Sequence, residues 1–429
     1  MSKFLIQGGR PLRGTISASG NKNAALKLLP ACLLTDEPVT LHNIPNIQDV
    51  NNTILILRDL GADVENIGEG SWRVHAKNVT KTKLDSVLAT RTRASFVFAG
   101  PMLGRLGQVQ LPIPGGDVIG GRPLDTHVQA FRSLGVQVEY EHQGVFNMNV
   151  NRLQGADMLL AEASVTATEN TIMAAVLAGG ETVINNAASE PHVRDLCDFL
   201  NHLGAKIMGI GTNRLIISGV DRLSGGEFTI GADFMEVGSF IGATAVTGGE
   251  VTIRNADPQN LGMVQLVYEK LGVHWLVDGN DIIVPAAQPM CIEAAVGGRV
   301  PQVKPMPWPG FPPDLMSIAV VIATQSNGSI LLHDWMYESR FFFVDNLVFM
   351  GAKIVLCDPH RVLVQGPSPL YASPHGVPSP DIRAGMAMVL AALCADGTST
   401  IHNIQQIDRG YEQIEKKLQS LGAEIKRVD

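Results

Sequence analysis

The chain of 429 residues is long enough for two or three domains with substantial cores, which excludes a single small module or a disulfide-stabilised scaffold. It carries 33 Lys and Arg against 41 Asp and Glu, a net charge of −8, whereas nucleic-acid-binding proteins are usually basic. The five cysteines lack paired or metal-ligand spacing, and no apolar run reaches the about 20 residues of a membrane span. We therefore expect a cytoplasmic protein without nucleic-acid or membrane partners.

The N-terminal part of the chain predicts an alternation of strands and helices. Residues 3–8 have the pattern of a strand, and a nearly uncharged helix begins near Asn23. A strand-like run then ends at Asn43, and an amphipathic helix over residues 53–60 stops at Gly61. A glycine in this place is typical of a left-handed helix cap that leads into the next strand.

This order of elements recurs five more times, at intervals of about seventy residues. The glycines that end the amphipathic helices are Gly61, Gly135, Gly204, Gly272, Gly351 and Gly422. The polar residues at the second landmark are Asn43, Asp117, Asn186, Asn255, Asp334 and Asn403. The uncharged helices begin near Asn23, Arg93, Thr168, Glu236, Asp314 and Arg383. Because a helix that is apolar on all sides is normally buried, we predict six repeats, each with an inner helix, an outer helix and several strands.

The two ends of the chain complement each other. The last copy stops at residues 421–425 and lacks the strand and turn that follow the glycine in the other copies. Residues 3–8 have the pattern of that missing strand, so we predict that the two termini meet in one domain. The period alone leaves open whether six repeats form one ring or two groups of three.

Basic residues recur at matched positions of the repeats. Those at the N-terminal ends of inner helices are Lys22, Arg93 and Arg383. Those five or six residues after the second landmark are Arg122, Arg340 and Arg409. Helix N-termini carry partial positive charge, and arginine presents a fork that fits carboxylate or phosphate. The pattern therefore predicts a small ligand with several negative charges.

Simpler interpretations exist for these residues. They are surface ion pairs of Arg340 with Glu338 and of Arg409 with Asp408, a solvated Lys22, a helix-capping Asp314 and a turn residue at Asp117. The repeat favours ligand binding, because independent surface charges do not recur at equivalent positions. P-loop, dinucleotide, zinc-protease and nucleophile-elbow motifs are missing from the sequence, so we expect neither metal nor serine-nucleophile chemistry.

Several ordered segments carry a resemblance to a known family. They are residues 19–25, the Pro-Gly-Gly loop with residues 122–127, and residues 164–170, 311–314, 338–341, 381–384 and 407–412. Together they resemble the enolpyruvyl transferases, in particular the branch that acts on UDP-N-acetylglucosamine, over essentially the whole chain. The resemblance implies an α/β fold in which each of two domains is an inside-out α/β barrel of three repeats with buried inner helices. It places residues 22–230 in the first domain, and residues 1–21 with 231–429 in the second.

The resemblance also implies an activity. The enolpyruvyl group of phosphoenolpyruvate passes to the 3-hydroxyl of UDP-N-acetylglucosamine through a tetrahedral ketal, and phosphate leaves; this is the first committed step of peptidoglycan precursor synthesis. The active site lies between the two domains, which close on substrate. A monomer without cofactor or metal is expected.

On the phosphoenolpyruvate side, the resemblance implies that Lys22, Arg122 and Arg409 hold the phosphate and carboxylate. Arg93 and Arg340 assist binding or closure. Asp117 protonates the methylene carbon.

On the acceptor side, the resemblance implies that Asp314 takes the proton of the sugar hydroxyl and that Asn23 orients the reacting centre. Ser164 and Val165 contact the uridine diphosphate. Met336 and Arg383 are also assigned to the substrate site.

The sequence departs from the family at several positions. Most members carry Cys where this chain has Asp117, and that thiol is the nucleophile that fosfomycin alkylates, so we predict insensitivity to this epoxide. We hypothesise that the charges of bound phosphoenolpyruvate favour the protonated form of Asp117. Glu162 replaces a Lys found in some members, and Pro313 and Met316 replace the usual Thr and Gln, which bears on nucleotide affinity and sugar identity.

Two other functions fit the same motifs. The first is enolpyruvyl transfer to another acceptor, either the shikimate-type substrate or a different uridine nucleotide. The second is a paralogue that binds a UDP-sugar without catalysis. Lys22, Asp117, Arg122, Asp314 and Arg409 argue against the binding role, because such a protein need not keep both a proton donor and a base.

Overall fold

The computed structural model describes residues 2–117, 119–141, 144–373 and 375–428. The chain divides into two compact units. Unit 2 contains residues 20–117 and 122–231, and unit 1 contains the described residues of 1–19, 118–121 and 232–429. The boundaries lie within two residues of those implied by the family resemblance, except that residues 119–121 of the Pro-Gly-Gly loop belong to unit 1. Val118 of this loop lies outside the described residues.

Unit 2 contains three inner and three outer helices. The inner ones are α1 (Lys22–Ala31), α4 (Ala99–Leu106), which extends the 3-10 helix η2 (Arg93–Phe98), and α6 (Val165–Ala175); the outer ones are α2 (Gln48–Asp59), α5 (Asp125–Ser133) and α7 (Pro191–His202). Its strands are β3 (Val39–His42), β4 (Asp63–Gly68), β5 (Ser71–His75), β6 (Gln108–Pro112), β7 (Gln137–Glu141), β8 (Val145–Asn149), β9 (Asp157–Leu159), β10 (Glu181–Asn185), β11 (Lys206–Met208), β12 (Arg214–Ser218) and β13 (Gly226–Thr229). The short α3 (Ser86–Ala89) and η1 (Cys32–Leu34) complete it.

Unit 1 repeats this plan. Its inner helices are α8 (Phe234–Val246), α10 (Met316–Gln325), which follows η4 (Pro313–Leu315), and α12 (Ile382–Cys394); its outer helices are α9 (Gly262–Lys270), α11 (Val344–Phe349) and α14 (Ile414–Ser420). Its strands are β1 (Lys3–Gln7), β2 (Arg13–Ser17), β14 (Glu250–Arg254), β15 (Leu276–Asp278), β16 (Asp281–Val284), β17 (Gln302–Val303), β18 (Gly328–His333), β19 (Lys353–Asp358), β20 (Arg361–Gly366), β21 (Val377–Pro378), β22 (Thr398–His402) and β23 (Glu424–Val428). The short α13 (Gln405–Asp408) and η3 (Pro258–Asn260) lie in its loops.

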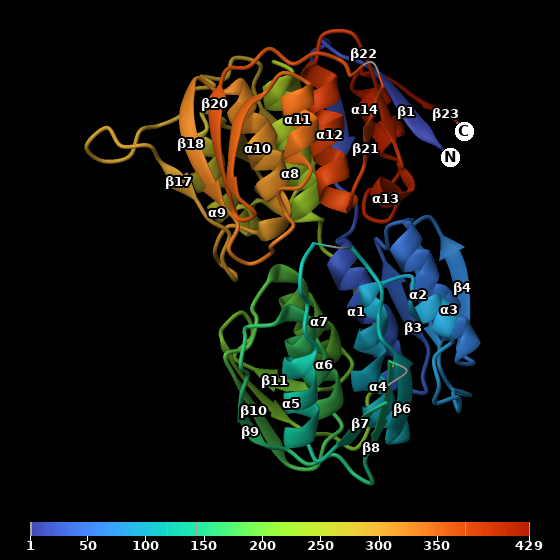
Figure 1. Cartoon of the computed structure of the whole chain (residues 1–429). Helices are drawn as coiled ribbons and strands as arrows, with labels where there is room; N and C mark the ends of the chain where they lie inside the picture. The colour runs from blue at the N-terminus through green and yellow to red at the C-terminus, as the bar shows by residue number, and fades with distance from the viewer. Residues whose placement is uncertain (1, 118, 142–143, 374, 429) are drawn as a thin grey trace. The chain divides into compact units, whose positions relative to one another are not determined.

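The inner helices form the core of each unit. In unit 1, α8, α10 and α12 pack side by side with the strands outside them, and almost all of their side chains are buried (Figure 1). In unit 2, α1, η2–α4 and α6 pack together in the same way. These segments are mostly apolar, so burial removes their side chains from water on every face, and the buried Lys27 of α1 pairs with Glu169 of α6. The predicted burial of the inner helices is confirmed.

The strands form six separate sheets, three in each unit. The sheets of unit 2 are β13-β3-β5-β4, β6-β8-β7 and β11-β12-β10-β9, and those of unit 1 are β15-β16-β14-β2, β17-β18-β20-β19 and β21-β22-β1-β23. No described strand is shared between two sheets, so each "barrel" is a set of separate sheets rather than a closed hydrogen-bonded cylinder. The two-unit, three-repeat plan answers the question that the repeat period left open.

Five of the six sheets take an edge strand from the preceding repeat, and the sixth, β6-β8-β7, receives from it only an isolated parallel bridge between Lys83 and Gln110. In unit 2, β9 pairs in parallel with β10 of the next repeat, and β13 at the end of the third repeat pairs in parallel with β3 of the first. In unit 1, β17 pairs in parallel with β18, and β21 with β22. Strand β2, near the N-terminus, pairs in parallel with β14 of the first repeat of this unit. Both units are therefore closed rings of three repeats.

The predicted left-handed glycine caps are confirmed. All six glycines at the ends of the outer helices have φ between +79° and +103°, a region that only glycine enters without strain. The asparagines of the second landmark also adopt positive φ, and the side chains of three of them fasten a neighbouring segment. Asn43 donates to Ile230 O (2.9 Å), Asn186 to Leu160 O (3.0 Å) and Asn403 to Ser379 O (2.8 Å).

The prediction that the N-terminus completes the last repeat is confirmed. Strand β1 pairs with β22 on one side and with β23 on the other, and Lys3 lies opposite Val428. The two ends of the described chain are accordingly neighbours in one sheet (Figure 1).

Candidate active site

The N-terminal ends of the inner helices in unit 2 lie at the same level. Lys27 of α1 pairs with Glu169 of α6 (Nζ to Oε2, 3.4 Å), and each lies five residues after Lys22 and Ser164 respectively. Asn170 of α6 accepts a hydrogen bond from Gly100 N of α4 (2.8 Å). These contacts hold the three helices in register, so Lys22, Arg93 and Ser164 are gathered at one end of unit 2.

Lys22 is the first residue of α1, behind the cap that Asn21 provides by accepting from Ala24 N (3.0 Å). Its side chain is only 8% exposed, and Nζ lies 2.8 Å from Oδ2 of the equally buried Asp49 in α2. The interpretation of Lys22 as a solvated surface residue is therefore wrong. No sequence pattern indicated Asp49, which lies in the first turn of the outer helix α2.

The Pro-Gly-Gly loop packs against the segment that begins η2. A Cβ on Gly115 would stand 1.8 Å from Thr90 O, and one on Gly116 (φ +117°) would stand 3.0 Å from Arg93 Cβ. Only glycine permits this approach, which brings the half-buried Asp117 close to Arg93 in the chain's fold. Arg93 Nη2 in turn donates to the carbonyl of Arg122, so both ends of the loop depend on Arg93.

A buried hydrogen-bonded cluster lies beneath these residues. Asn170 Nδ2 donates to Phe96 O (2.9 Å) and to His127 Nδ1 (3.0 Å), which leaves the proton of His127 on Nε2, facing Thr166 Oγ1 (3.0 Å). Burial, and then the charge of Arg93, lower the pKa of His127 to about 3. The ring is therefore neutral near pH 7 and fixes the starts of α5 and α6 to η2.

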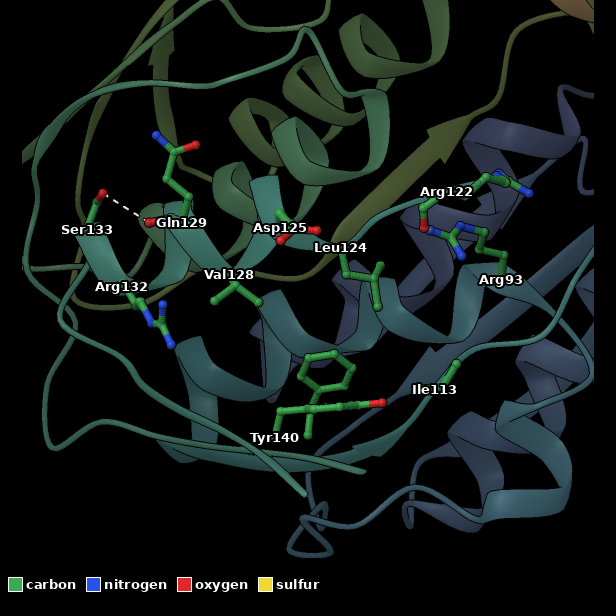
Figure 2. Close-up of a pocket in the computed structure, with 11 residues that line it drawn as sticks. Arg93, Ile113, Arg122, Leu124, Asp125, Val128, Gln129, Arg132, Ser133 and Tyr140 are labelled. Atoms are coloured by element: carbon green, nitrogen blue, oxygen red, sulfur yellow. Dashed lines mark hydrogen bonds between the residues drawn. The ribbon is translucent and has the colours of Figure 1, made fainter. Parts of the chain in front are cut away.

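An open groove of about 910 Å³ runs along α5 in unit 2. Figure 2 shows Arg93 and Arg122 at one end, Arg132 and Ser133 at the other, and Tyr140 between them. Ile113, Leu124, Val128 and Phe146 also line it. The groove combines arginine side chains with an apolar wall, and so provides room beside Arg93 and Arg122 for an anionic group attached to an apolar or ring-shaped body.

Asp314 is the centre of the polar cluster in unit 1. It lies in η4, before α10, and its carboxylate pairs with Arg383 Nε (3.0 Å) and Arg340 Nη2 (3.3 Å). Its side chain remains 31% exposed, whereas both arginines are almost fully buried. The N-cap of α10 is Leu315, with no side-chain cap bond, so the interpretation of Asp314 as the cap of this helix is wrong.

Arg340 is held between two carboxylates. Besides Asp314, it faces the fully buried Asp334, whose Oδ2 lies 3.6 Å from Nε. Burial alone would lower the pKa of Arg340, but Asp314, Asp381 and Asp334 raise it above its ordinary value. Glu338 instead accepts a hydrogen bond from Gly121 N (3.1 Å). The interpretation of Arg340 and Glu338 as a surface ion pair is therefore wrong.

Arg383 lies over an aromatic ring that sequence patterns did not indicate. Its guanidinium is 5.2 Å from the centroid of buried Tyr411, whose hydroxyl also bonds Ser239 Oγ of α8 (2.9 Å). Asp381 caps α12 by accepting from Arg383 N (2.8 Å). These contacts join the start of α12 to the other inner helices of unit 1.

Arg409 follows α13 directly. Its Nη1 donates to Gln406 Oε1 (2.9 Å), while the neighbouring Asp408 makes a two-bond ion pair with Arg427.

The structure thus distributes the predicted site residues over the two units. Unit 2 carries Lys22, Asn23, Arg93, Asp117, Arg122, Ser164 and Val165, and unit 1 carries Asp314, Met336, Arg340, Arg383 and Arg409. Among the residues at departures from the family, Glu162 is exposed and Met316 is fully buried in the core of unit 1. No sequence pattern indicated a site role for Asp49 or Tyr411, and Asp334 was indicated only as a landmark of the repeat.

Two general features concern the described chain alone. None of its helices is both long and apolar enough to cross a membrane. The same residues contain no group of three or more His, Cys, Asp or Glu arranged to hold a metal ion.

The protein is similar in sequence and in fold to known proteins. A family model described as EPSP synthase (3-phosphoshikimate 1-carboxyvinyltransferase) matches residues 6–418. The chain belongs to the EPSP synthase family. The resemblance to enolpyruvyl transferases is thereby confirmed.

Relatives within the EPSP synthase family are similar over their full length. The UDP-N-acetylglucosamine 1-carboxyvinyltransferase of Treponema denticola is 51% identical, with 99% of this chain and 99% of the relative covered. The protein of the same name from Bradyrhizobium diazoefficiens is also 51% identical, with 99% and 98% covered, and that from Borreliella burgdorferi is 50% identical, with 100% and 99% covered.

Solved structures of the EPSP synthase family share the fold at lower identity. The enolpyruvyl transferase NikO from Streptomyces tendae has a TM-score of 0.89 at 21% identity, with 100% of this chain and 99% of that chain covered. EPSP synthase from Acinetobacter baumannii has a TM-score of 0.75 at 17% identity, with 100% of both chains covered. They confirm the predicted two-domain α/β fold class.

Proposed function

We propose that the protein transfers the enolpyruvyl group of phosphoenolpyruvate to the 3-hydroxyl of UDP-N-acetylglucosamine and releases phosphate, the first committed step of peptidoglycan precursor synthesis. The observation that carries this proposal is the identity of about half of the residues, over the full length, with proteins named for this reaction. Membership of the EPSP synthase family supports the reaction type.

For phosphoenolpyruvate, we assign Lys22, Arg122 and Arg409 to its phosphate and carboxylate, with Arg93 and Arg340 in support. Lys22 is already fixed by Asp49 and Arg93 by the carbonyl of Arg122, so little side-chain freedom is lost on binding. Arg340 is fixed by its two carboxylate neighbours. Fixed cations of this kind lower the barrier by orienting the anion and by stabilising charge that develops on it.

For the acceptor, we assign Asp314 as the base, Asn23 as the group that orients the reacting centre, and Ser164 and Val165 to the diphosphate. Val165 begins α6 and Ser164 caps it, so the free backbone N–H groups of a helix N-terminus are available to an anion. Arg383 pairs with Asp314, and the backbone N–H of Met336 donates to Asp334, which faces Arg340; we assign Met336 and Arg383 to the substrate site.

The proposed chemistry proceeds in two balanced steps. In the first, Asp314 accepts the proton of the 3-hydroxyl, the sugar oxygen bonds to C2 of phosphoenolpyruvate, and Asp117 gives its proton to C3, which yields a tetrahedral ketal. In the second, the bond between C2 and the phosphate oxygen breaks, C3 gives a proton to the Asp117 carboxylate, the C2–C3 double bond returns, and phosphate leaves with the proton that Asp314 took from the 3-hydroxyl. Groups from both units therefore serve one reaction.

Phosphate release from purified protein tests the proposal. The protein is incubated with phosphoenolpyruvate and, in separate arms, UDP-N-acetylglucosamine, another UDP-sugar, a uridine mononucleotide and shikimate 3-phosphate. We expect release only with UDP-N-acetylglucosamine, and loss of release in Asp314→Asn and Lys22→Ala. Release with another acceptor alone identifies the variant transferase, and silence in every arm identifies the binding-only paralogue.

We further propose that the enzyme works as a monomer in the cytosol. The five cysteines are free thiols, as expected in a reducing compartment. Gel filtration at the mass of one chain, with and without substrates, checks the oligomeric state.

A further inference from the structure

Arg427 of unit 1 pairs with two carboxylates at once, those of Asp408 and Glu415. Its Nη1 and Nη2 bond the two carboxylate oxygens of Asp408 (2.9 and 2.7 Å), and its Nε and Nη2 bond those of Glu415 (2.8 and 3.2 Å). The two carboxylates together raise the pKa of Arg427 above its ordinary value. All three nitrogens of the Arg427 guanidinium therefore donate hydrogen bonds to these two carboxylates.

Arg427 is itself fixed by the sheet. It lies on β23 opposite Phe4 of β1, and its guanidinium lies 5.0 Å from the centroid of the Phe4 ring. Phe4 and Arg427, from opposite ends of the chain, are thus in contact. Asp408 and Glu415 bond to an arginine whose position is set by the pairing of β1 with β23.

Asp408 connects this network to the proposed active site. It is the last residue of α13, and Arg409 is the residue that caps this four-residue helix. The other end of α13 is fastened by Asn403, which donates to Ser379 O (2.8 Å). A helix of one turn has little stability of its own. It is held by packing against α12, with Ile407 fully buried, and by its two end contacts, of which the one at Asp408 lies next to Arg409.

We propose that Arg427 is a positioning residue for phosphoenolpyruvate binding: through its two-bond pair with Asp408 it sets the position of α13, and thereby aims Arg409 at the substrate. This inference rests on the proposed function, in which Arg409 binds phosphoenolpyruvate. Arg427 acts through Asp408 and need not touch the substrate. The fork geometry of arginine is required, because lysine offers a single point charge.

A different result is expected if the pair of Arg427 and Asp408 only stabilises the fold. Arg427 and Asp408 are 31% and 21% exposed, and partly exposed pairs add little to stability. If the pair only stabilised the sheet, its loss would lower the thermal midpoint and leave both Michaelis constants unchanged in the folded fraction. If it positions Arg409, the KM for phosphoenolpyruvate changes and that for UDP-N-acetylglucosamine does not.

The test measures kcat and both KM values of the full-length enzyme by phosphate release, with thermal melts of every variant. The variants are Arg427→Ala, Arg427→Lys, Asp408→Asn, the double variant Arg427→Ala/Asp408→Asn, and Arg409→Ala as the reference. Arg10→Ala is the matched control, because Arg10 pairs with Glu424 on the same strand (2.6 Å) without contact to α13.

We expect Arg427→Ala to raise the KM for phosphoenolpyruvate by about tenfold, since a misplaced binding group can cost up to about 100-fold. The KM for UDP-N-acetylglucosamine should stay within about twofold, Arg427→Lys should restore only part of the loss, and the double variant should be no worse than Arg427→Ala alone. Arg10→Ala should behave as the unmodified enzyme.

Other results overturn the inference. If Arg409→Ala raises the KM for phosphoenolpyruvate but Arg427→Ala and Asp408→Asn do not, Arg427 has no positioning role. Equal changes in both KM values, or additive effects in the double variant, have the same consequence. If Arg409→Ala itself leaves the KM for phosphoenolpyruvate unchanged, the assignment of Arg409 in the proposed function fails instead. Should Arg427→Ala not fold, Asp408→Asn, which keeps the side-chain size, decides.

Discussion

Asp117 shows how one side chain depends on its local surroundings. It lies on a loop whose two glycines pack against Thr90 and Arg93, five residues after β6 ends at Pro112. The other landmark residues follow their strands directly, so the Pro-Gly-Gly segment is an extension that displaces this one landmark toward Arg93. The backbone of this loop therefore sets the place of Asp117, the residue that we propose as the proton donor.

We predict a distinct pH dependence for Asp117 compared with Asp117→Cys. A carboxyl group loses its proton at lower pH than a thiol, so kcat of the unmodified enzyme should decline on the alkaline side before that of the Asp117→Cys variant does. Superimposable pH–rate profiles would contradict the role of Asp117 as the donor.

The same variant tests the response to fosfomycin. The intact mass of the unmodified protein should be unchanged after incubation, because residue 117 offers no thiol, and Asp117→Cys should gain the mass of one molecule. A covalent adduct on the unmodified protein would show that another residue reacts.

Gly115 offers a second test at the scale of one residue. Gly115→Ala places a Cβ 1.8 Å from Thr90 O, so the loop must move away, and we expect kcat to fall by at least about tenfold. Gly121→Ala is the control, because nothing lies within 4 Å of its added Cβ. Steady-state kinetics and thermal melts distinguish the two; equal kinetics would show that the contact with Thr90 does not position Asp117.

At the scale of elements, the cluster of His127 and Asn170 joins α5, α6 and η2 in one buried network. Because the pKa of His127 is about 3 in the folded protein, the native ring stays neutral on acidification while the unfolded chain takes up a proton near pH 6.5. The unfolded state therefore binds more protons, and the stability contributed by neutral His127 is present above pH 6.5 and lost as the pH falls toward 3.

We predict that His127→Gln lowers the thermal midpoint more at pH 7.5 than at pH 4.5. At the lower pH the unmodified protein has already lost up to a few kcal/mol of this contribution. The control is His202→Gln, an exposed position at the end of α7. Equal losses at the two pH values would contradict the low pKa of His127.

The elements were largely predictable from sequence, and the partners of the charged residues were not. Gly61 and its five equivalents mark helix ends because a positive φ has a local cause that shows in the sequence. The pairing of residues 3–8 with the last repeat also followed, because a missing strand leaves a gap in the period. Asp49 beside Lys22 and Asp314 beside Arg383 depend on which elements pack together, and no sequence spacing records that.

The ion pairs predicted from neighbouring charges in the sequence were wrong because the partners depend on how the elements pack. Glu338 stands two residues from Arg340, yet the buried guanidinium turns inward to Asp314 and Asp334. Asp408 is adjacent to Arg409, yet it bonds to Arg427 on the last strand. The nearest opposite charge along a chain is a poor guide when burial favours carboxylates brought in from other elements.

At the scale of the whole molecule, the chain leaves unit 1 after β2, completes unit 2, and returns to unit 1 at α8. The N-terminal strand β1 is an inner strand of its sheet, between β22 and β23. Its removal would expose the backbone groups of two strands at once, whereas joining it to β23 would leave every pairing intact.

We predict that a circular permutant folds and retains activity. The original ends are joined by a short Gly-Ser linker, and new ends are opened between Gly297 and Gly298, where Val296 is 88% exposed and an added Cβ meets nothing. Deletion of residues 2–7 is the comparison and should abolish folding of unit 1. Thermal melts and phosphate release report the outcome; a permutant that fails to fold while the deletion tolerates the loss would refute the role of β1.

The closure of each unit, in which the last repeat pairs with the first, fixes the number of repeats. In an open solenoid, a repeat can be added or removed at an end, where a modified terminal copy shields the stack from water. Here β13 returns to β3 and β2 returns to β14, so neither unit has a terminal copy to duplicate or discard. Over evolutionary time, change in such a protein is confined to loop length and side-chain chemistry at the ends of the buried helices, which is where a new acceptor would have to be accommodated.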